Sequence, residues 1–235
     1  MIMSTIEQNL QAVRRSIAQA AAEAQRPADA VTLLAVSKTF GVDAVLAAAA
    51  AGQTAFGENY LQEALDKIAA ARLALPQEAI EWHFIGPIQS NKTRPIAEHF
   101  DWVHTVEREK IAARLSEQRP DSMPDLNICL QVNISGEASK SGVSPEELPA
   151  LARAVAQLPK LRLRGLMAIP EPQTDPALQR AAFAQLRSLY EQLRADGLAL
   201  DTLSMGMSSD LQAAVLEGAT IVRVGSAIFG SRNYS

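Results

Sequence analysis

The sequence has a single cysteine, Cys129, so no disulfide can form within the chain. This cysteine stands inside the apolar run ICLQVNI, which predicts a buried core thiol rather than a nucleophile. Long apolar runs are also missing, since the longest, AVLAAAAAG, is too short to span a bilayer. The start, MIMSTIEQNL, lacks the basic segment and apolar stretch of a secretory signal. Together these absences favour a cytoplasmic protein that is not embedded in a membrane.

Basic clusters and metal-ligand spacings are scarce as well. No run rich in Lys and Arg stands out, and the formal charge of -4 argues against nucleic-acid binding. The three histidines, His83, His99 and His104, show no metal-ligand spacing with one another or with Cys129, so we expect no metal site. What the chain does have is 235 residues with 48% apolar content, enough for an ordinary folded core.

Apolar, β-rich segments alternate with amphipathic ones along the whole chain. Strands are predicted over 31–38, 54–57, 81–86, 101–106, 126–134, 161–169, 198–205 and 220–225. An extra N-terminal helix is expected over 4–25, and later helices over 42–51, 58–75, 89–99 (with Pro95 kinking or dividing it), 107–118, 144–158, 175–197 and 208–217.

Eight β-then-α units are the count of a closed parallel barrel, and the length suits one. Without a visible linker, we predict an α/β fold of one domain over 1–235, a single (β/α)8 TIM barrel. An open, doubly wound sheet is the alternative, because closure cannot be seen in a sequence.

The residues with reactive or polar side chains lie where the predicted strands end, which is the functional rim of such barrels. Lys38 closes the first strand and shares a face with Val36 and Leu34. An apolar setting lowers the pKa of a lysine, and a neutral amine can attack an aldehyde to form a Schiff base. The alternative is that Lys38 merely extends into solvent from a strand end.

A second group of candidates follows the last two strands, in SMGMSSD and RVGSAIFGSR. Barrels often bind phosphate between these two loops, where glycine lets backbone amides approach and serine adds a hydroxyl, as Gly225 and Ser226 would. Ordinary glycine-serine turns are the alternative. Arg223 interrupts the eighth strand, and its charge needs either a salt bridge, for example to Glu58, or a ligand such as a heteroaromatic ring nitrogen.

Other residues near strand ends are less decisive. Asn59 either caps the helix after the second strand or lines the site. We interpret His83 as a core imidazole with its hydrogen bonds satisfied, although a place in the site stays open. The roles of Asn91 and Lys92, after the third strand, are left undecided.

Four blocks, LLAVSKTF, FGENYLQEALDK, WHFIGPIQSNK and LSMGMSSDLQAAVLEGATIVRVGSAIFG, resemble the YggS/PROSC family of pyridoxal-phosphate homeostasis proteins. That family is similar in fold to the barrel domain of alanine racemase, PLP fold type III. The resemblance implies pyridoxal 5'-phosphate (PLP) as cofactor, held as an internal aldimine on Lys38. It also implies that Arg223 faces the pyridine nitrogen. The resemblance further implies that the phosphate is bound by Ser208, Gly225 and Ser226. It also implies that the pocket is lined by Asn59 and Met207.

A racemase needs two opposed proton carriers, and Lys38 could supply only one. In alanine racemase the other is a tyrosine that comes with a second domain and a partner subunit. Here Tyr60 and Tyr190 fall on predicted helices and Tyr234 in a tail, and the chain stops soon after the eighth strand. We therefore expect a PLP-binding protein that buffers or delivers PLP to PLP-dependent apo-enzymes, works as a monomer and has little or no catalytic turnover.

Two other functions stay open at this point. One is a small PLP-dependent amino-acid racemase or decarboxylase that uses Lys38 and an acid such as His83. The other is a barrel that binds a phosphate ester without a covalent bond, in which Lys38 is only a counter-ion.

Overall fold

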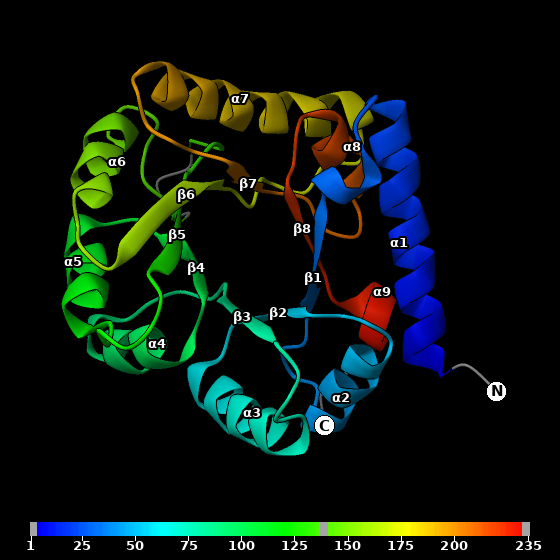
Figure 1. Ribbon diagram of the computed structural model, residues 1–235. Helices are drawn as coiled ribbons and strands as arrows, with labels where there is room; N and C mark the ends of the chain where they lie inside the picture. The colour runs from blue at the N-terminus through cyan, green and yellow to red at the C-terminus, as the bar shows by residue number, and fades with distance from the viewer. Residues whose placement is uncertain (1–3, 137–140, 232–235) are drawn as a thin grey trace.

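A computed structural model describes residues 4–136 and 141–231. Its strands form one closed parallel barrel in chain order, and Figure 1 looks along the barrel with the helices around it. The strands are β1 (Thr32–Val36), β2 (Ala55–Glu58), β3 (Glu81–Phe84), β4 (Trp102–Val106), β5 (Leu126–Gln131), β6 (Leu161–Met167), β7 (Thr202–Ser204) and β8 (Ile221–Val224). The predicted (β/α)8 barrel is confirmed. The open-sheet alternative is wrong, because β1 pairs directly with β8, with Leu34 opposite Arg223.

Helices cover the outside of the barrel, and all but the first and the last connect successive strands. They are α1 (Thr5–Glu23), α2 (Val42–Ala50), α3 (Leu61–Ala74), α4 (Thr93–His99), α5 (Glu109–Gln118), α6 (Leu148–Ala156), α7 (Pro176–Ala195), α8 (Leu211–Leu216) and α9 (Ser226–Phe229), with short 3-10 turns η1 (Ala28–Ala30) and η2 (Ser90–Lys92). The extra helix α1 lies beside α8 and α9 (Figure 1). As predicted, Ser4 caps α1, and its side chain accepts a hydrogen bond from the Glu7 amide.

Several predicted boundaries differ from the structure. The helix expected from Ser144 begins at Leu148, because Pro149 has no N–H to donate to the Pro145 carbonyl. The helix predicted over 89–99 is divided, as expected for Pro95, into η2 and α4, because Pro95 has no N–H to donate to the Asn91 carbonyl. The seventh strand is shorter than predicted, because the Leu200 amide donates to the Leu198 carbonyl in a tight turn before β7.

The strands bury side chains on both faces. Outward residues such as Leu33 and Ala35 pack under the helices in the main core. Inward residues form a separate interior cluster of Leu34, Val36, Ala55, Ile85, Trp102, Cys129, Met167 and Ile221. Cys129 is fully buried, as predicted, and burial raises the pKa of its thiol to about 12. The barrel is therefore a packed core with no open channel, and the chemistry must lie at its rim.

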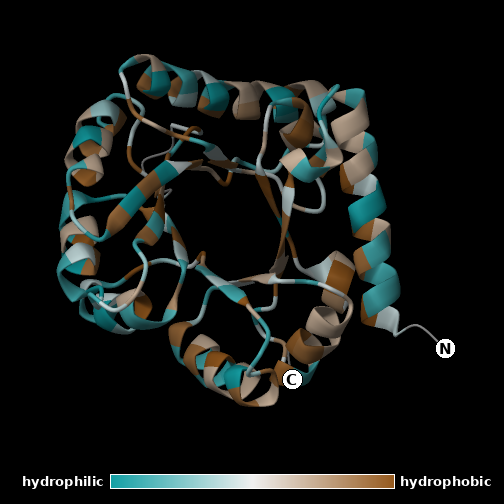
Figure 2. Cartoon of the chain, in the orientation of Figure 1, coloured by the Kyte–Doolittle hydropathy of each residue, from teal (hydrophilic) through white to brown (hydrophobic). Residues whose placement is uncertain are grey.

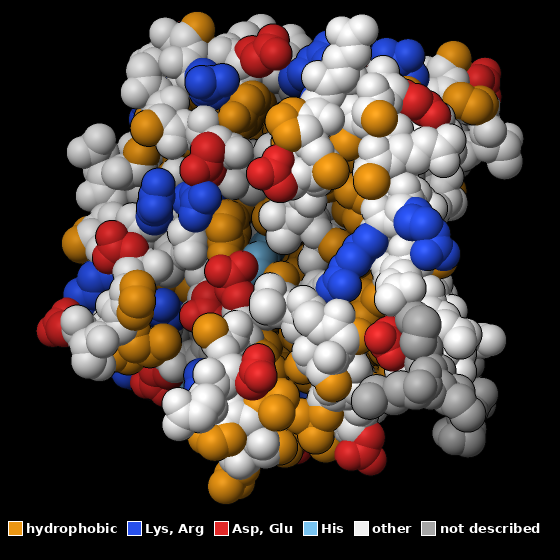
Figure 3. All heavy atoms as spheres, turned by 45° about the vertical axis from the view of Figure 1, so that its right-hand side comes forward, with side chains coloured by type: hydrophobic (Ala, Val, Ile, Leu, Met, Phe, Trp, Pro, Cys, Tyr) orange, Lys and Arg blue, Asp and Glu red, His pale blue; other side chains and the backbone are white. Residues whose placement is uncertain are grey.

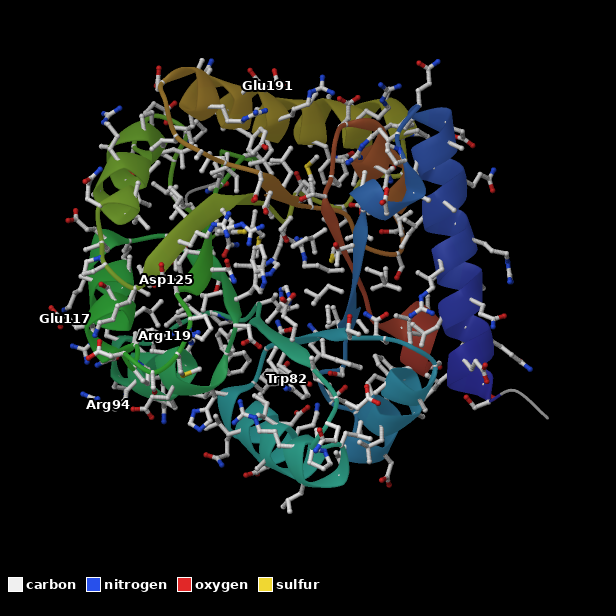
Figure 4. All side chains as sticks on the ribbon, viewed as in Figure 1. Trp82, Arg94, Glu117, Arg119, Asp125 and Glu191 are labelled. Atoms are coloured by element: carbon white, nitrogen blue, oxygen red, sulfur yellow. The ribbon has the colours of Figure 1, made fainter. Side chains whose placement is uncertain are left out.

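Figure 4 shows side chains filling the barrel interior. Trp82 and Arg119 are buried between strands and helices, whereas Arg94, Glu117 and Glu191 point outward. Hydrophilic and hydrophobic residues alternate along α1 and α7 (Figure 2), as expected for helices that cover a core. On the face in Figure 3, acidic and basic side chains are interspersed. In the described part of the chain, no helix is long and apolar enough to cross a membrane.

Candidate functional site

Lys38 stands in a turn directly after β1, with its side chain half-buried. The strand ends at Val36, two residues earlier than the predicted stretch, so the turn rather than the strand pleat sets the direction of Lys38. The turn is conformationally unusual, since Thr39 has φ 68°, a left-handed conformation that is uncommon for a threonine. Val36 and Leu34 face the barrel interior, as the predicted face requires.

A buried ion pair behind the turn holds it in place. Lys67 on α3 donates from Nζ to the Ser37 carbonyl at 2.9 Å and to Glu58 Oε1 at 2.6 Å. The Ser37 hydroxyl donates to the same Glu58 oxygen at 2.6 Å. The Thr39 amide donates to Glu63 Oε1 at 2.7 Å, and Lys67 also pairs with Glu63 at 2.9 Å. Both residues that flank Lys38 are thus fixed by α3.

Burial is the main electrostatic influence on Glu58. The side chains of Glu58 and Lys67 are 0% and 3% exposed. Burial raises the pKa of Glu58, while the charge and hydrogen bond of Lys67 act in the opposite direction. The sequence did not single out Lys67, because a lysine four residues after Glu63 has the spacing of an ordinary exposed ion pair on a helix. The signal that could have revealed it is Glu58, an acidic residue at a strand end.

Arg223 is buried inside the barrel and uses its guanidinium as a donor. Nη1 donates to Ser204 Oγ at 2.7 Å and Nη2 donates to the Ala168 carbonyl at 3.0 Å. The suggested salt bridge to Glu58 is wrong, because Glu58 pairs with Lys67. Burial lowers the pKa of Arg223 to about 10, so it stays charged at neutral pH. Three of its five N–H hydrogens have no acceptor among the described residues, which leaves donors for a ligand.

The loops after β7 and β8 meet beside β1. Gly225, which precedes α9, lies so close to β1 that an added Cβ would stand 3.1 Å from the Val36 carbonyl oxygen. The first amides of α9 lack partners within their own helix and can bind an anion. Ser226 is exposed, as are Met207 and Ser208 on the neighbouring loop. The structure therefore brings the predicted phosphate corner next to the strand that leads to Lys38.

Asn59 follows β2 at the same end of the barrel. Its Oδ1 atom is buried and has no hydrogen-bond partner among the described residues. The capping alternative is wrong, since the N-cap of α3 is Tyr60 and no side chain caps that helix. A buried acceptor without a partner is costly in a folded protein, so a ligand that donates to Asn59 is the natural complement.

The donor set matches the cofactor that the sequence resemblance implies. PLP carries an aldehyde, a ring nitrogen and a phosphate. A lysine amine can react with the first, an arginine N–H can bond to the second, and glycine amides with serine hydroxyls can bind the third. Lys38, Arg223 and the Gly225–Ser226 corner supply these three kinds of group on adjacent strands. The residues present therefore fit PLP.

The other sequence candidates lie apart from this group. His83 is a core imidazole with both ring nitrogens bonded, as interpreted. His99 bonds to the Pro95 carbonyl, and Asn91 and Lys92 are exposed on η2. Tyr190 donates to the Leu200 carbonyl at 3.1 Å, Tyr60 is exposed and precedes α3, and Tyr234 lies outside the described residues. Within residues 4–136 and 141–231, no group of three or more potential ligands could hold a metal ion.

Comparisons with known proteins identify the family to which the chain belongs. The family model described as alanine racemase, N-terminal domain, matches residues 8–233. The pyridoxal phosphate homeostasis protein of Pseudomonas aeruginosa is 65% identical over 99% of this chain and 98% of its own length. The protein of the same name in Escherichia coli is 51% identical, covering 99% of each chain.

Two solved structures are similar to this chain in fold. PipY of Synechococcus elongatus, determined with PLP bound, superposes with a TM-score of 0.83 at 38% identity, covering 96% of this chain and 100% of that one. Alanine racemase from Corynebacterium glutamicum has a TM-score of 0.71 at 19% identity, over 97% of this chain and 61% of the racemase. This second likeness bears on the fold alone.

Proposed function

Because this chain belongs to the alanine racemase N-terminal domain family and, within it, to the pyridoxal phosphate homeostasis proteins, we propose that it binds PLP and buffers or delivers it, with little or no catalytic turnover. One observation carries the proposal. The Lys38 turn, the spare Arg223 donors and the Gly225 corner lie together at one end of the barrel.

Each residue has a defined task in this proposal. Lys38 holds the cofactor covalently through Nζ, and Arg223 donates a hydrogen bond to the ring nitrogen. Ser208, Gly225 and Ser226 bind the phosphate, while Asn59 and Met207 line the pocket. When bound, the cofactor supplies an electron sink for carbanion charge. Arg223, which stays charged, does not give its proton to the ring nitrogen and so weakens that sink. Weak carbanion stabilisation favours storage over catalysis.

Borohydride reduction tests the covalent bond. The protein is mixed with PLP, reduced and digested, and the labelled peptide is identified by mass spectrometry. We expect label on Lys38 and loss of the visible absorbance of bound cofactor after reduction. Lys38→Ala should abolish the label, and Lys110→Ala, which changes an exposed lysine of α5, should leave it intact. Binding without label on Lys38 would support the barrel that binds a phosphate ester without a covalent bond.

An isotope-exchange assay separates a carrier from an enzyme. The runner-up function, an amino-acid racemase or decarboxylase, required an acid such as His83. That imidazole is 1% exposed and both of its nitrogens are engaged, so it is not available to a substrate. We expect negligible exchange of the α-hydrogen of amino acids in the PLP-loaded protein. Turnover of about 1 per second or more would contradict the carrier proposal.

Three further properties belong to the same proposal. The partners are PLP-dependent apo-enzymes that receive the cofactor, the chain acts as a monomer, and it works in the cytoplasm. Loss of visible absorbance from the loaded protein, matched by a gain of activity in an added apo-enzyme, tests delivery. Light scattering should give a mass near the 25.3 kDa of one chain. A doubled mass would contradict the monomer.

A further inference from the structure

A continuous series of hydrogen bonds runs through the barrel interior from Arg223 to Glu81. Arg223 Nη1 donates to Ser204 Oγ at 2.7 Å, and that hydroxyl lies 2.7 Å from His104 Nδ1. His104 Nε2 lies 2.8 Å from His83 Nδ1, and His83 Nε2 lies 2.8 Å from Glu81 Oε1. Ser204, His104 and His83 are 0 to 1% exposed, whereas the Glu81 side chain is 48% exposed.

The two ends of the series fix the direction of its hydrogen bonds. An ionised Glu81 can only accept, so His83 must carry its proton on Nε2. A neutral His83 then accepts at Nδ1, and His104 must donate from Nε2. His104 in turn accepts at Nδ1 from the Ser204 hydroxyl, whose oxygen accepts from the arginine, which can only donate. Each donor meets an acceptor, so no buried group is left unsatisfied along this path.

The contact between the two imidazoles disfavours the charged forms. If either histidine took a second proton, either two N–H groups would face each other across 2.8 Å, or His104 would donate from Nδ1 to Ser204 and the buried Ser204 hydroxyl would lose its acceptor. Packing prevents the His83 ring from rotating out of this contact, because the ring stacks on the Trp102 indole with centroids 5.2 Å apart and planes 7° apart. Arg164 covers that indole at 4.6 Å from its centroid, and the charge of Arg223, on β8, lowers the pKa of His104. Glu81 and Asp101 act in the opposite direction on His83, but burial outweighs them. Burial lowers the pKa of both histidines.

We propose that Ser204, His104 and His83 are positioning residues that hold the Arg223 guanidinium in the orientation in which its remaining donors meet the cofactor ring. The part that concerns the ring rests on the proposed function. The series connects an arginine at the carboxyl ends of the strands with a carboxylate at the start of β3. It therefore fixes the guanidinium through a relay of neutral groups rather than through a direct salt bridge.

Nitrogen NMR of the imidazoles tests the relay without any cofactor. In uniformly labelled protein at neutral pH, we expect His83 and His104 both to be neutral and protonated on Nε2. His99, the third histidine of the chain, is half-buried on α4 and serves as the internal comparison. An Nδ1-protonated or doubly protonated form at either His83 or His104 would overturn the relay, whether or not the protein binds PLP.

Ser204→Ala tests the positioning role in the PLP-loaded protein. The change removes the acceptor for Arg223 Nη1 and the donor to His104. We expect the dissociation constant for PLP to rise about tenfold and the absorbance maximum of bound cofactor to shift, as the ring loses a fixed donor. Ser204→Thr, which keeps the hydroxyl, should restore both.

Ser116→Ala is the matched control, because Ser116 is also buried but bonds to the Pro159 carbonyl, away from the site. It should leave the dissociation constant and the spectrum unchanged. Ser204→Ala that binds PLP with wild-type affinity and spectrum would overturn the positioning role. If the wild-type protein takes up no PLP, the proposed function fails instead, and the NMR result still decides the relay. If Ser204→Ala does not fold, the tautomers of the wild-type protein decide it as well.

Discussion

Lys67 fixes the turn that presents Lys38. Its ammonium meets Glu58, Glu63 and the Ser37 carbonyl within 2.9 Å. Lys67→Met would leave the fully buried Glu58 carboxylate without a cation. We expect the free energy of unfolding to fall by about 3–5 kcal/mol, the usual cost of breaking one partner of a buried pair. Urea denaturation followed by circular dichroism measures this change.

A double variant separates the ion pair from simple packing. Glu58→Gln combined with Lys67→Met removes both charges and should recover most of the lost stability. Lys110→Met, on the exposed face of α5, should change the free energy of unfolding by no more than about 0.5 kcal/mol. A double variant as unstable as Lys67→Met alone would show that the lost hydrogen bonds of the Lys67 ammonium to Ser37 and Glu63, rather than the unpaired Glu58 charge, account for the loss.

Individual site residues differ in how well the sequence predicted them. Lys38 and Arg223 stand in apolar strand contexts where a charge is conspicuous, so each could be singled out. The partner of Arg223 could not, because Ser204 and the Ala168 carbonyl come from other strands and only the three-dimensional register brings them together. The identity of Lys38 as the covalent residue stays a prediction.

Elements were predicted better than their ends. Apolar periodicity located each strand and helix, because burial on a sheet or under a helix requires it. The ends depend on single hydrogen bonds, such as the one from Leu200 that shortens β7, or on the missing amide of Pro149 that delays α6. These are local effects that a hydrophobic pattern does not contain.

The loop between β7 and α8 depends on Gly206, which has φ +99° and would place a Cβ 2.5 Å from that of Ala214. Gly206→Ala should therefore lower the free energy of unfolding by about 3 kcal/mol, from backbone strain and from overlap. It should also weaken PLP binding, because Met207 and Ser208 follow directly. Denaturant unfolding and a PLP titration measure the two effects.

Gly52→Ala provides the strain-only control. Gly52 has a similar φ of +86°, but nothing lies within 4 Å of its added Cβ. We expect a cost of about 1–2 kcal/mol and unchanged PLP binding. Equal losses in the two variants would mean that contact with α8 contributes nothing to the loop.

At the scale of the whole molecule, the sequence predicted a closed barrel only from the count of eight β/α units, and the structure confirms the closure. Closure is what places β8, with β7 on its other side, against β1 and sets the phosphate corner beside the Lys38 strand. It also explains why the histidine relay was missed, since His104 and Ser204 are 100 residues apart and meet only across the closed barrel.

The same relay predicts how the stability of the whole protein depends on pH. His83 and His104 have pKa values lowered from 6.5 by burial, so the unfolded chain takes up protons before the folded chain does. The free energy of unfolding therefore decreases as the pH drops below about 6.5, the ordinary pKa of histidine, and continues to decrease until the pH reaches the lowered pKa values of the folded chain. Each histidine contributes up to about 1.4 kcal/mol per pH unit. The Glu81 pKa is lowered by its hydrogen bond from His83, so that contribution is lost only at more acid pH.

Urea unfolding at a series of pH values between neutrality and mild acid measures this slope. His104→Gln should flatten it by the share of one histidine, because glutamine cannot titrate in this range. A slope that is flat in the wild-type protein, or one that His104→Gln leaves unchanged, would mean that the buried imidazoles are not held neutral. The direction of the relay would then have to be abandoned, since it depends on two neutral rings in contact.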